Sequence, residues 1–243
     1  MHIFDHRQLT QTSTGYTGIC ASGYGARIFG GHSLAHSLIA ASAAIDHSRT
    51  ASSLHAIFLS PGKSAEPVRY SPSALKRGRA FDVVRVDASQ GDRLILDTTV
   101  SFHDGEPGLE YQEVPPEVPP AESLADDPLR KYQRSDARAP FHCRTLPHDP
   151  RLPRMQTWIR TVDQLEVGPL QHQAALTYAL AFLITRTAHN PIDADEVRHR
   201  GASLDHTMWF HRPFRADEWL LVDVTAVSYF GSRSLCRCRQ VAE

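Results

Sequence analysis

Two stretches of this chain decide its fold: FGGHSLAHSLIAASAAIDHS at residues 29–48 and PLQHQAALTYALAFLITRTA at residues 169–188. Apolar and small residues recur at helical spacing in both, as Leu34, Leu38, Ala41 and Ile45 in the first and as Leu176, Ala179, Leu180 and Leu183 in the second. This spacing predicts a buried helix over residues 33–46 and another over residues 169–188. The many Ala and Ser residues of the first helix allow a sheet to wrap closely around it.

Each predicted helix is followed by runs of strand-like residues, separated by turn signals such as Pro61-Gly62 and Gly91-Asp92. The runs after the first helix cover residues 53–60, 67–75, 80–88 and 93–103, and those after the second cover 203–211, 218–227 and 232–241. Residues 155–162 can form a further strand. A helix followed by antiparallel strands indicates the α+β class, with the helix on one face of the sheet. Because the order occurs twice, the chain contains a weak internal repeat of roughly 140 residues.

A segment rich in proline separates the two patterns. Residues 104–153 hold many prolines and charges and few β-branched residues, which is typical of a linker that runs over the surface. The predicted division is a first domain at residues 1–112, a Pro-rich linker at 113–153 and a second domain at 154–243.

Composition and charge exclude several classes of protein. The chain has 243 residues, of which 41% are hydrophobic and 22% are charged, as in ordinary globular proteins. A formal net charge of −1 predicts no binding to nucleic acid or to an anionic membrane surface. No run reaches the ~20 apolar residues that a membrane helix needs, and the N-terminus lacks the apolar region of a signal peptide. We therefore expect a cytoplasmic protein.

The first helix begins with residues of chemical interest. His32 and His36 lie four residues apart on one face, as two zinc ligands can, but Ser33 stands where a metalloprotease has Glu, and no third ligand is evident. We therefore predict no metal and no cofactor, and the pair is either polar lining near a site or plain packing. Gly30 and Gly31 either offer backbone N–H groups to an oxyanion or allow tight packing.

Asp205 is the most informative carboxylate. Alternation along residues 203–211 places Asp205 and Trp209 on one face of a strand and His206 on the other. A carboxylate within an aromatic-rich strand has to be paired, exposed or functional, because burying it alone is costly. A salt bridge with Arg212 or Arg215 is the structural alternative. No nucleophile motif, such as G-x-S-x-G, is present in the sequence.

The sequence GASLDHTMWFHRPFRADEWLLVDV at residues 201–224 closely resembles the hallmark stretch of the type II acyl-CoA thioesterases. FGGHSLAHSLIAASAA resembles the first helix of that family, in which Gln usually stands at the positions of His32 and His36. The segments at residues 54–62 and 69–88 are similar to the strands that follow. The resemblance implies a double hotdog fold, in which two helices are each wrapped by a curved antiparallel sheet.

The resemblance also implies an activity and its residues. Members of this family hydrolyse acyl-CoA to a free acid and a thiol without a covalent intermediate, and an Asp, a Ser or Thr, and a Gln position the attacking water. Asp205 matches the Asp, and Ser228 fits the hydroxyl best, with Val227 in the adjacent position. His32 is a third catalytic candidate at the helix start. The expected substrate-binding residues are Gly30, Gly31, His55 and Trp209.

Three departures from the family pattern widen the choice of function. The second domain is predicted to be truncated at the last strand, which carries the Gln in the family, Ala181 stands where the second helix usually has Asp, and both Gln positions of the first helix are His. One alternative is a biosynthetic hotdog enzyme that uses Asp205 and His32 for dehydration, cyclisation or another proton transfer. The other is a non-catalytic acyl-binding protein.

The expected partner is an acyl-CoA or an acyl-carrier-protein thioester. Because the edges of hotdog sheets usually pair with another copy, we also expect a homodimer or a larger homo-oligomer.

Overall fold

The computed structural model describes residues 4–23, 26–45, 49–127, 140–149, 151–166, 168–189 and 201–242. The predicted helix end at Asp46 and residues 128–139 of the predicted linker lie outside this part. No helix of the described residues is long and apolar enough to cross a membrane.

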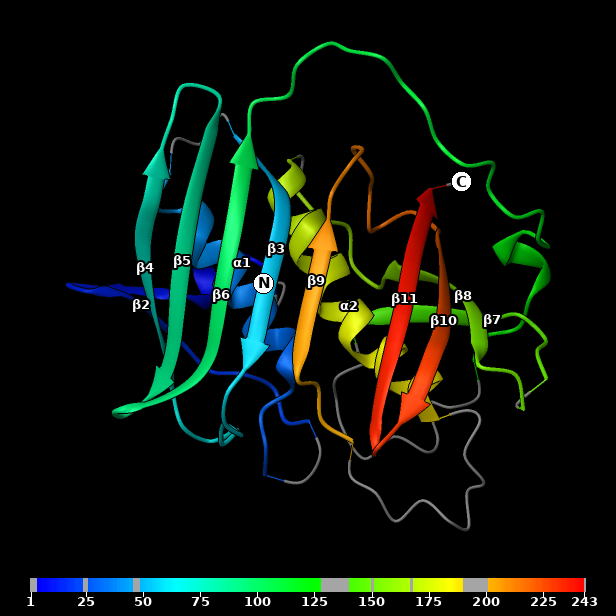
Figure 1. Ribbon diagram of the computed structural model, residues 1–243, viewed down its shortest axis with the longest axis horizontal. Coiled ribbons are helices and arrows are strands. Elements are labelled where there is room, and N and C mark those ends of the chain that lie inside the picture. The colour runs from blue at the N-terminus through cyan, green and yellow to red at the C-terminus, as the bar shows by residue number, and fades with distance from the viewer. Residues whose placement is uncertain are drawn as a thin grey trace.

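Two helices lie side by side at the centre of the molecule (Figure 1). Helix α1 spans Gly30–Ser42 and is buried from Gly31 onward, and helix α2 spans Pro169–His189. The helices approach closely at Gly31, where a Cβ atom would lie 2.5 Å from the backbone oxygen of Tyr178. The ring of Phe29 packs against that of Tyr178 with centroids 4.8 Å apart. Close packing therefore requires the small residue at the start of α1.

A seven-stranded antiparallel sheet covers α1, with the strand order β1-β2-β4-β5-β6-β3-β9. Its strands are β1 (Thr10–Thr12), β2 (Gly15–Gly18), β3 (Thr50–Phe58), β4 (Val68–Arg77), β5 (Phe81–Gln90), β6 (Arg93–His103) and β9 (Asp205–Trp209). The alternation in β5 and β6 follows the predicted pattern, because Val84, Val86 and Val100 are fully buried against the helix.

A four-stranded antiparallel sheet covers part of α2, with the order β11-β10-β8-β7. Its strands are β7 (Phe141–Thr145), β8 (Arg154–Thr161), β10 (Leu220–Phe230) and β11 (Arg233–Ala242). Strand β7 and the short 3₁₀ helix Ala121–Ser123 both fall within the range expected to be a linker. A second 3₁₀ helix, His6–Gln8, precedes β1. Two helices with antiparallel sheets confirm the predicted α+β class.

The two halves are joined edge to edge through β9. This strand follows α2 in the chain, yet it pairs with β3 of the first half, from Ser53 opposite Trp209 to Ile57 opposite Asp205. One hydrophobic core, which includes Leu38 of α1 and Leu183 of α2, runs through both halves. The halves therefore form a single packed body.

Candidate functional site

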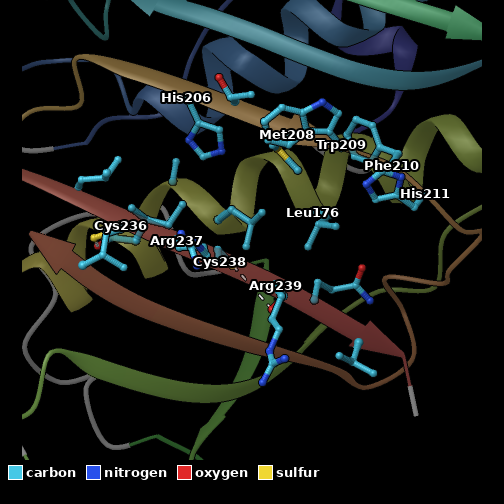
Figure 2. A pocket seen from close by; sticks show the side chains of 18 of the residues that line it. Leu176, His206, Met208, Trp209, Phe210, His211, Cys236, Arg237, Cys238 and Arg239 are labelled. Atoms are coloured by element: carbon cyan, nitrogen blue, oxygen red, sulfur yellow. Dashed lines mark hydrogen bonds between the residues drawn. The ribbon is translucent and has the colours of Figure 1, made fainter. Parts of the chain in front are cut away.

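A groove of about 1740 Å³ lies between β9 and β11 (Figure 2). Its floor is the apolar face of α2, with Leu176, Leu180 and Ile184, and the segment of residues 106–115 borders it. Periodicity predicted Leu176 and Leu180 as core, and in this half of the fold they lie beneath an open space. An apolar floor with a few polar groups at the walls is typical of a small-molecule site.

Asp205 lies at the start of β9, where it is exposed and lines the groove. Its predicted alternative partners are engaged elsewhere. Arg212 pairs with Glu110 at 3.1 Å, and Arg215 pairs with Asp217 at 2.6 Å. The salt-bridge alternative is therefore wrong for this structure, and within the described part of the chain the Asp205 carboxylate has no ion pair and is open to water.

His206 is a groove residue that sequence reasoning missed as a site candidate. It lies on the inward face of β9 and is 6% exposed, and its Nε2 atom has no hydrogen-bond partner among the described residues. Burial lowers the pKa of His206 to about 4, although the charge of Asp205 acts in the opposite direction. The strand alternation places His206 on the inward face, but a buried histidine is not by itself a sign of function.

Trp209 and His55 lie together on the outer face of the joined sheet. The two rings meet edge to face with centroids 5.7 Å apart, because His55 of β3 is opposite Thr207 of β9. Trp209 is 60% exposed and lines the groove, whereas His55 is beside it but outside the groove lining.

Ser228 and Val227 point to opposite faces of β10 from those that simple alternation along the strand predicts. Strand β10 has a bulge between Ala226 and Ser228, which shifts the register by one residue. Val227 consequently lines the groove, while Ser228 is exposed and outside its lining. The structure does not bring the Ser228 hydroxyl to the groove that holds Asp205. Ala181, where the resembled family has Asp, also lines the groove.

His32 belongs to a separate, buried cluster on α1. Its Nδ1 atom accepts a hydrogen bond from the Ala21 N–H at 2.8 Å, and its Nε2 atom has no partner among the described residues. Burial lowers the pKa of His32 to about 4, so the ring is neutral near pH 7. The centroids of the His32 and His36 rings are 4.3 Å apart. The Nδ1 atom of His36 lies 3.3 Å from the hydroxyl oxygen of Tyr70.

Gly30 and Gly31 serve close packing. A Cβ atom at Gly30 would lie 2.9 Å from the ring of Phe58, and one at Gly31 would meet the backbone of Tyr178. None of Gly30, Gly31 and His32 lines the groove. Of the predicted site residues, Asp205 and Trp209 therefore lie at the groove, whereas His55, Ser228 and the three residues of the α1 start lie outside its lining.

Comparisons of sequence give matches over most of the chain. The family model of the acyl-CoA thioesterase N-terminal domain matches residues 21–103, and the acyl-CoA thioesterase model matches residues 134–241. The acyl-CoA thioesterase 2 of Haemophilus influenzae is 31% identical over 230 residues, which cover 87% of this chain and 80% of that protein. Mouse acyl-coenzyme A thioesterase 8 is 30% identical over 239 residues, covering 88% and 74%.

Solved structures agree on the fold. An acyl-CoA thioesterase II from Mycobacterium marinum superposes with a TM-score of 0.85 at 30% identity, covering 99% of this chain and 91% of that one. A protein with a hot dog fold from Alicyclobacillus acidocaldarius gives a TM-score of 0.76 at 18% identity, covering 95% and 88%. These similarities confirm the predicted double hotdog.

Proposed function

Because this chain belongs to the type II acyl-CoA thioesterase family, we propose that it hydrolyses an acyl-CoA thioester to a free carboxylic acid and the CoA thiol. The observation that carries this proposal is the open Asp205 carboxylate at the wall of a groove with an apolar floor. A carboxylate accepts a proton from water, and an apolar groove accepts an acyl chain. Both requirements of the reaction thus meet in one place.

The proposed reaction needs one water molecule and no covalent enzyme intermediate. Asp205 accepts a proton as the water oxygen attacks the thioester carbonyl carbon, and a tetrahedral oxyanion forms. The oxyanion collapses, the C–S bond breaks, and the departing thiolate takes up the proton held by Asp205. The acid and the thiol leave, and the carboxylate is regenerated.

The acyl chain is proposed to lie along α2, over Leu176 and Leu180, with Asp205 and Trp209 at opposite ends of the β9 wall. Catalytic roles for Ser228 and His32, and substrate contacts at Gly30, Gly31 and His55, stay predictions from the sequence. Three further expectations also stay predictions from the sequence: a carrier-protein thioester as substrate, a homo-oligomeric state and a cytoplasmic location.

Acyl binding without turnover is the second candidate function. Two residues of the groove lining, Ala181 and Val227, favour it. Both side chains are apolar and cannot hold a water molecule, as polar side chains at these positions could. Loss of one polar group that acts in a transition state commonly costs a factor of ~100 or more. The two candidates differ in whether thiol is released.

The test is incubation with a panel of acyl-CoAs and a thiol reagent, for the wild type and for Asp205→Asn. The proposed mechanism predicts saturable CoA release and a kcat at least ~100-fold lower in the variant. Asp92→Asn, at an exposed turn, is the matched carboxylate control and should keep wild-type turnover. Unchanged turnover in folded Asp205→Asn would remove Asp205 from the mechanism. Binding of acyl chains with no thiol release would favour the second candidate.

A further inference from the structure

Two loops at one end of the joined sheet are held together by backbone pairing. The first contains Arg27, shortly before α1, and the second contains Lys63, which follows β3. Arg27 and Lys63 form an antiparallel bridge, and the N–H of Ile28 donates to the oxygen of Gly62 at 3.0 Å. We call the loop around Arg27 and the loop around Lys63 the loop pair.

A buried glutamine fixes the second loop. Gln90 is the last residue of β5 and is 6% exposed. Its side-chain oxygen accepts a hydrogen bond from the N–H of Lys63 at 2.8 Å. Its amide nitrogen donates to the backbone oxygens of Lys63 and Glu66, at 2.8 and 2.9 Å. These bonds hold the backbone in place and use none of the side chain of Lys63, which stays exposed.

The loop pair places two cations directly opposite each other. Both Arg27 and Lys63 are exposed, and like charges at opposite positions of an antiparallel pair destabilise it. Glu66 pairs with Lys63 at 2.8 Å, but the two side chains are 47% and 66% exposed, and such an ion pair contributes little. Arg27 has no ion pair in the part of the chain that the structure describes. Two cations and one carboxylate therefore leave a net positive charge on the loop pair.

The loop pair lies beyond the end of the groove at which Asp205 stands. Ile57 of β3 is opposite Asp205 of β9, and the N–H of Phe58 donates to the oxygen of Leu204 at 2.9 Å. Figure 1 shows β3 ending and β9 beginning at this end of the sheet. The chain from Ile57 to Lys63 spans at most about 20 Å, so both loops stay close to Asp205.

The proposed acyl position determines where the rest of a substrate leaves the groove. The acyl chain extends from Asp205 along α2, and Trp209 is at the other end of the β9 wall. The thiol part of the thioester therefore extends past the start of β9, on the side of the loop pair. In CoA this part carries phosphate groups beyond the pantetheine arm. Phosphates bind guanidinium and ammonium groups through short, charge-assisted hydrogen bonds.

We propose that Arg27 and Lys63 bind phosphate groups of the CoA part of the substrate. The guanidinium of Arg27 offers two parallel N–H donors to one phosphate, and the ammonium group of Lys63 adds a point charge. An anion between the two cations removes their repulsion, and the carboxylate of Glu66 opposes its binding. The inference rests on the proposed hydrolysis for the identity of the ligand. Because CoA binding is measured without turnover, the two proposals can fail separately.

Calorimetric titration of the 243-residue protein with free CoA measures this binding directly. Arg27→Ala and Lys63→Ala should each weaken CoA binding at least about threefold, and the double variant at least about tenfold. Arg79→Ala, at an exposed arginine before β5, is the matched control and should bind as the wild type does. Equal affinity of the wild type and the double variant, or no saturation of the wild type up to about 1 mM, would overturn the proposal.

Two changes of charge separate phosphate binding from a structural role of the loops. Glu66→Gln removes the opposing carboxylate and should strengthen CoA binding about twofold, while its backbone oxygen still accepts from Gln90. Arg27→Glu should weaken CoA binding more than Arg27→Ala does. A structural role predicts weaker binding in all of these variants alike, and that result counts against the proposal.

Ligands that lack phosphates identify the group that is bound. Pantetheine has no phosphate and should bind to the wild type and to the double variant of Arg27 and Lys63 with equal affinity. A loss for pantetheine as large as the loss for CoA would refute phosphate binding, and inorganic phosphate that binds as tightly as CoA would refute its assignment to CoA. Thiol release by a protein whose CoA binding ignores these substitutions would remove the phosphate site alone. Weaker CoA binding in the variants of a protein that releases no thiol would remove hydrolysis alone.

Discussion

Replacing His32 by Gln should make the protein less sensitive to acid. The buried His32 ring has its pKa lowered to about 4, from 6.5 in the unfolded chain, because burial disfavours the imidazolium. Between these two pH values the unfolded state holds a proton that the folded state lacks. The free energy of unfolding therefore falls as the pH falls from 6.5 to about 4. Above pH 6.5 His32 is neutral in both states and does not make stability depend on pH.

The size of this change in stability follows from the size of the pKa shift of His32. One such group changes the free energy of unfolding by about 1.4 kcal/mol per pH unit within the window, or about 3 kcal/mol across it. His206 contributes in the same window for the same reason. The pKa of His36 is also lowered, by burial first and by His32 second, so removal of His32 relieves part of that shift as well.

The assay is urea unfolding at half-unit steps from pH 7 to pH 4.5. His32→Gln should lower the slope of unfolding free energy against pH by about 1 kcal/mol per unit in the middle of the window, about 1.4 kcal/mol per unit being the limit for one group. His211→Gln, at an exposed residue, serves as the matched control. Equal slopes in wild type and His32→Gln would mean that the folded protein protonates His32 freely, and would refute the account of its burial.

Further predictions concern packing, an ion-pair network and the groove. Gly31→Ala should destabilise the protein by about 2 kcal/mol in thermal or urea unfolding, because its Cβ atom meets the Tyr178 backbone, whereas Gly108→Ala, which meets nothing within 4 Å, should not. Asp223→Asn should lower the free energy of unfolding by about 2 kcal/mol, because Asp223 is 5% exposed and accepts two hydrogen bonds from Arg154, at 2.9 and 2.7 Å. A decrease below about 0.5 kcal/mol would contradict this. Leu176→Ala should raise the KM for long acyl chains more than for acetyl-CoA in the thiol-release assay, and an equal effect on both would exclude the floor of α2 as the acyl surface.

Much of the fold could be predicted because its elements are locally encoded. Both helices and the long strands form close to their expected ranges, although α1 begins earlier than predicted, at Gly30, and ends earlier, at Ser42. Strand β7 was not predicted, because Phe141–Thr145 is short and lies among prolines, and only tertiary pairing with β8 makes it a strand. The β3–β9 ladder joins distant parts of the chain, and no local pattern specifies it.

The site was predictable where alternation holds and not where it fails. Asp205 and Trp209 lie on the face that the period of two assigns to them. The bulge in β10 reverses the faces of Val227 and Ser228, and a one-residue insertion in a ladder leaves no periodic signal. The burial of His32 depends on contacts with Ala21 and Tyr178, which the helix sequence alone does not specify.

The pairing of β9 with β3 has a consequence for synthesis on the ribosome. Strand β3 emerges early, but its partner along one edge, Asp205–Trp209, emerges only after α2 has been made. Until then the nascent chain exposes an open strand edge, which is a site for pairing with other chains. Contacts between residues so far apart in sequence also slow folding, because the closure of a long loop comes before any gain from the ladder. Chaperone demand should therefore be greatest during synthesis of residues 59–204, and cleavage between the halves after folding should leave both fragments held together by this ladder.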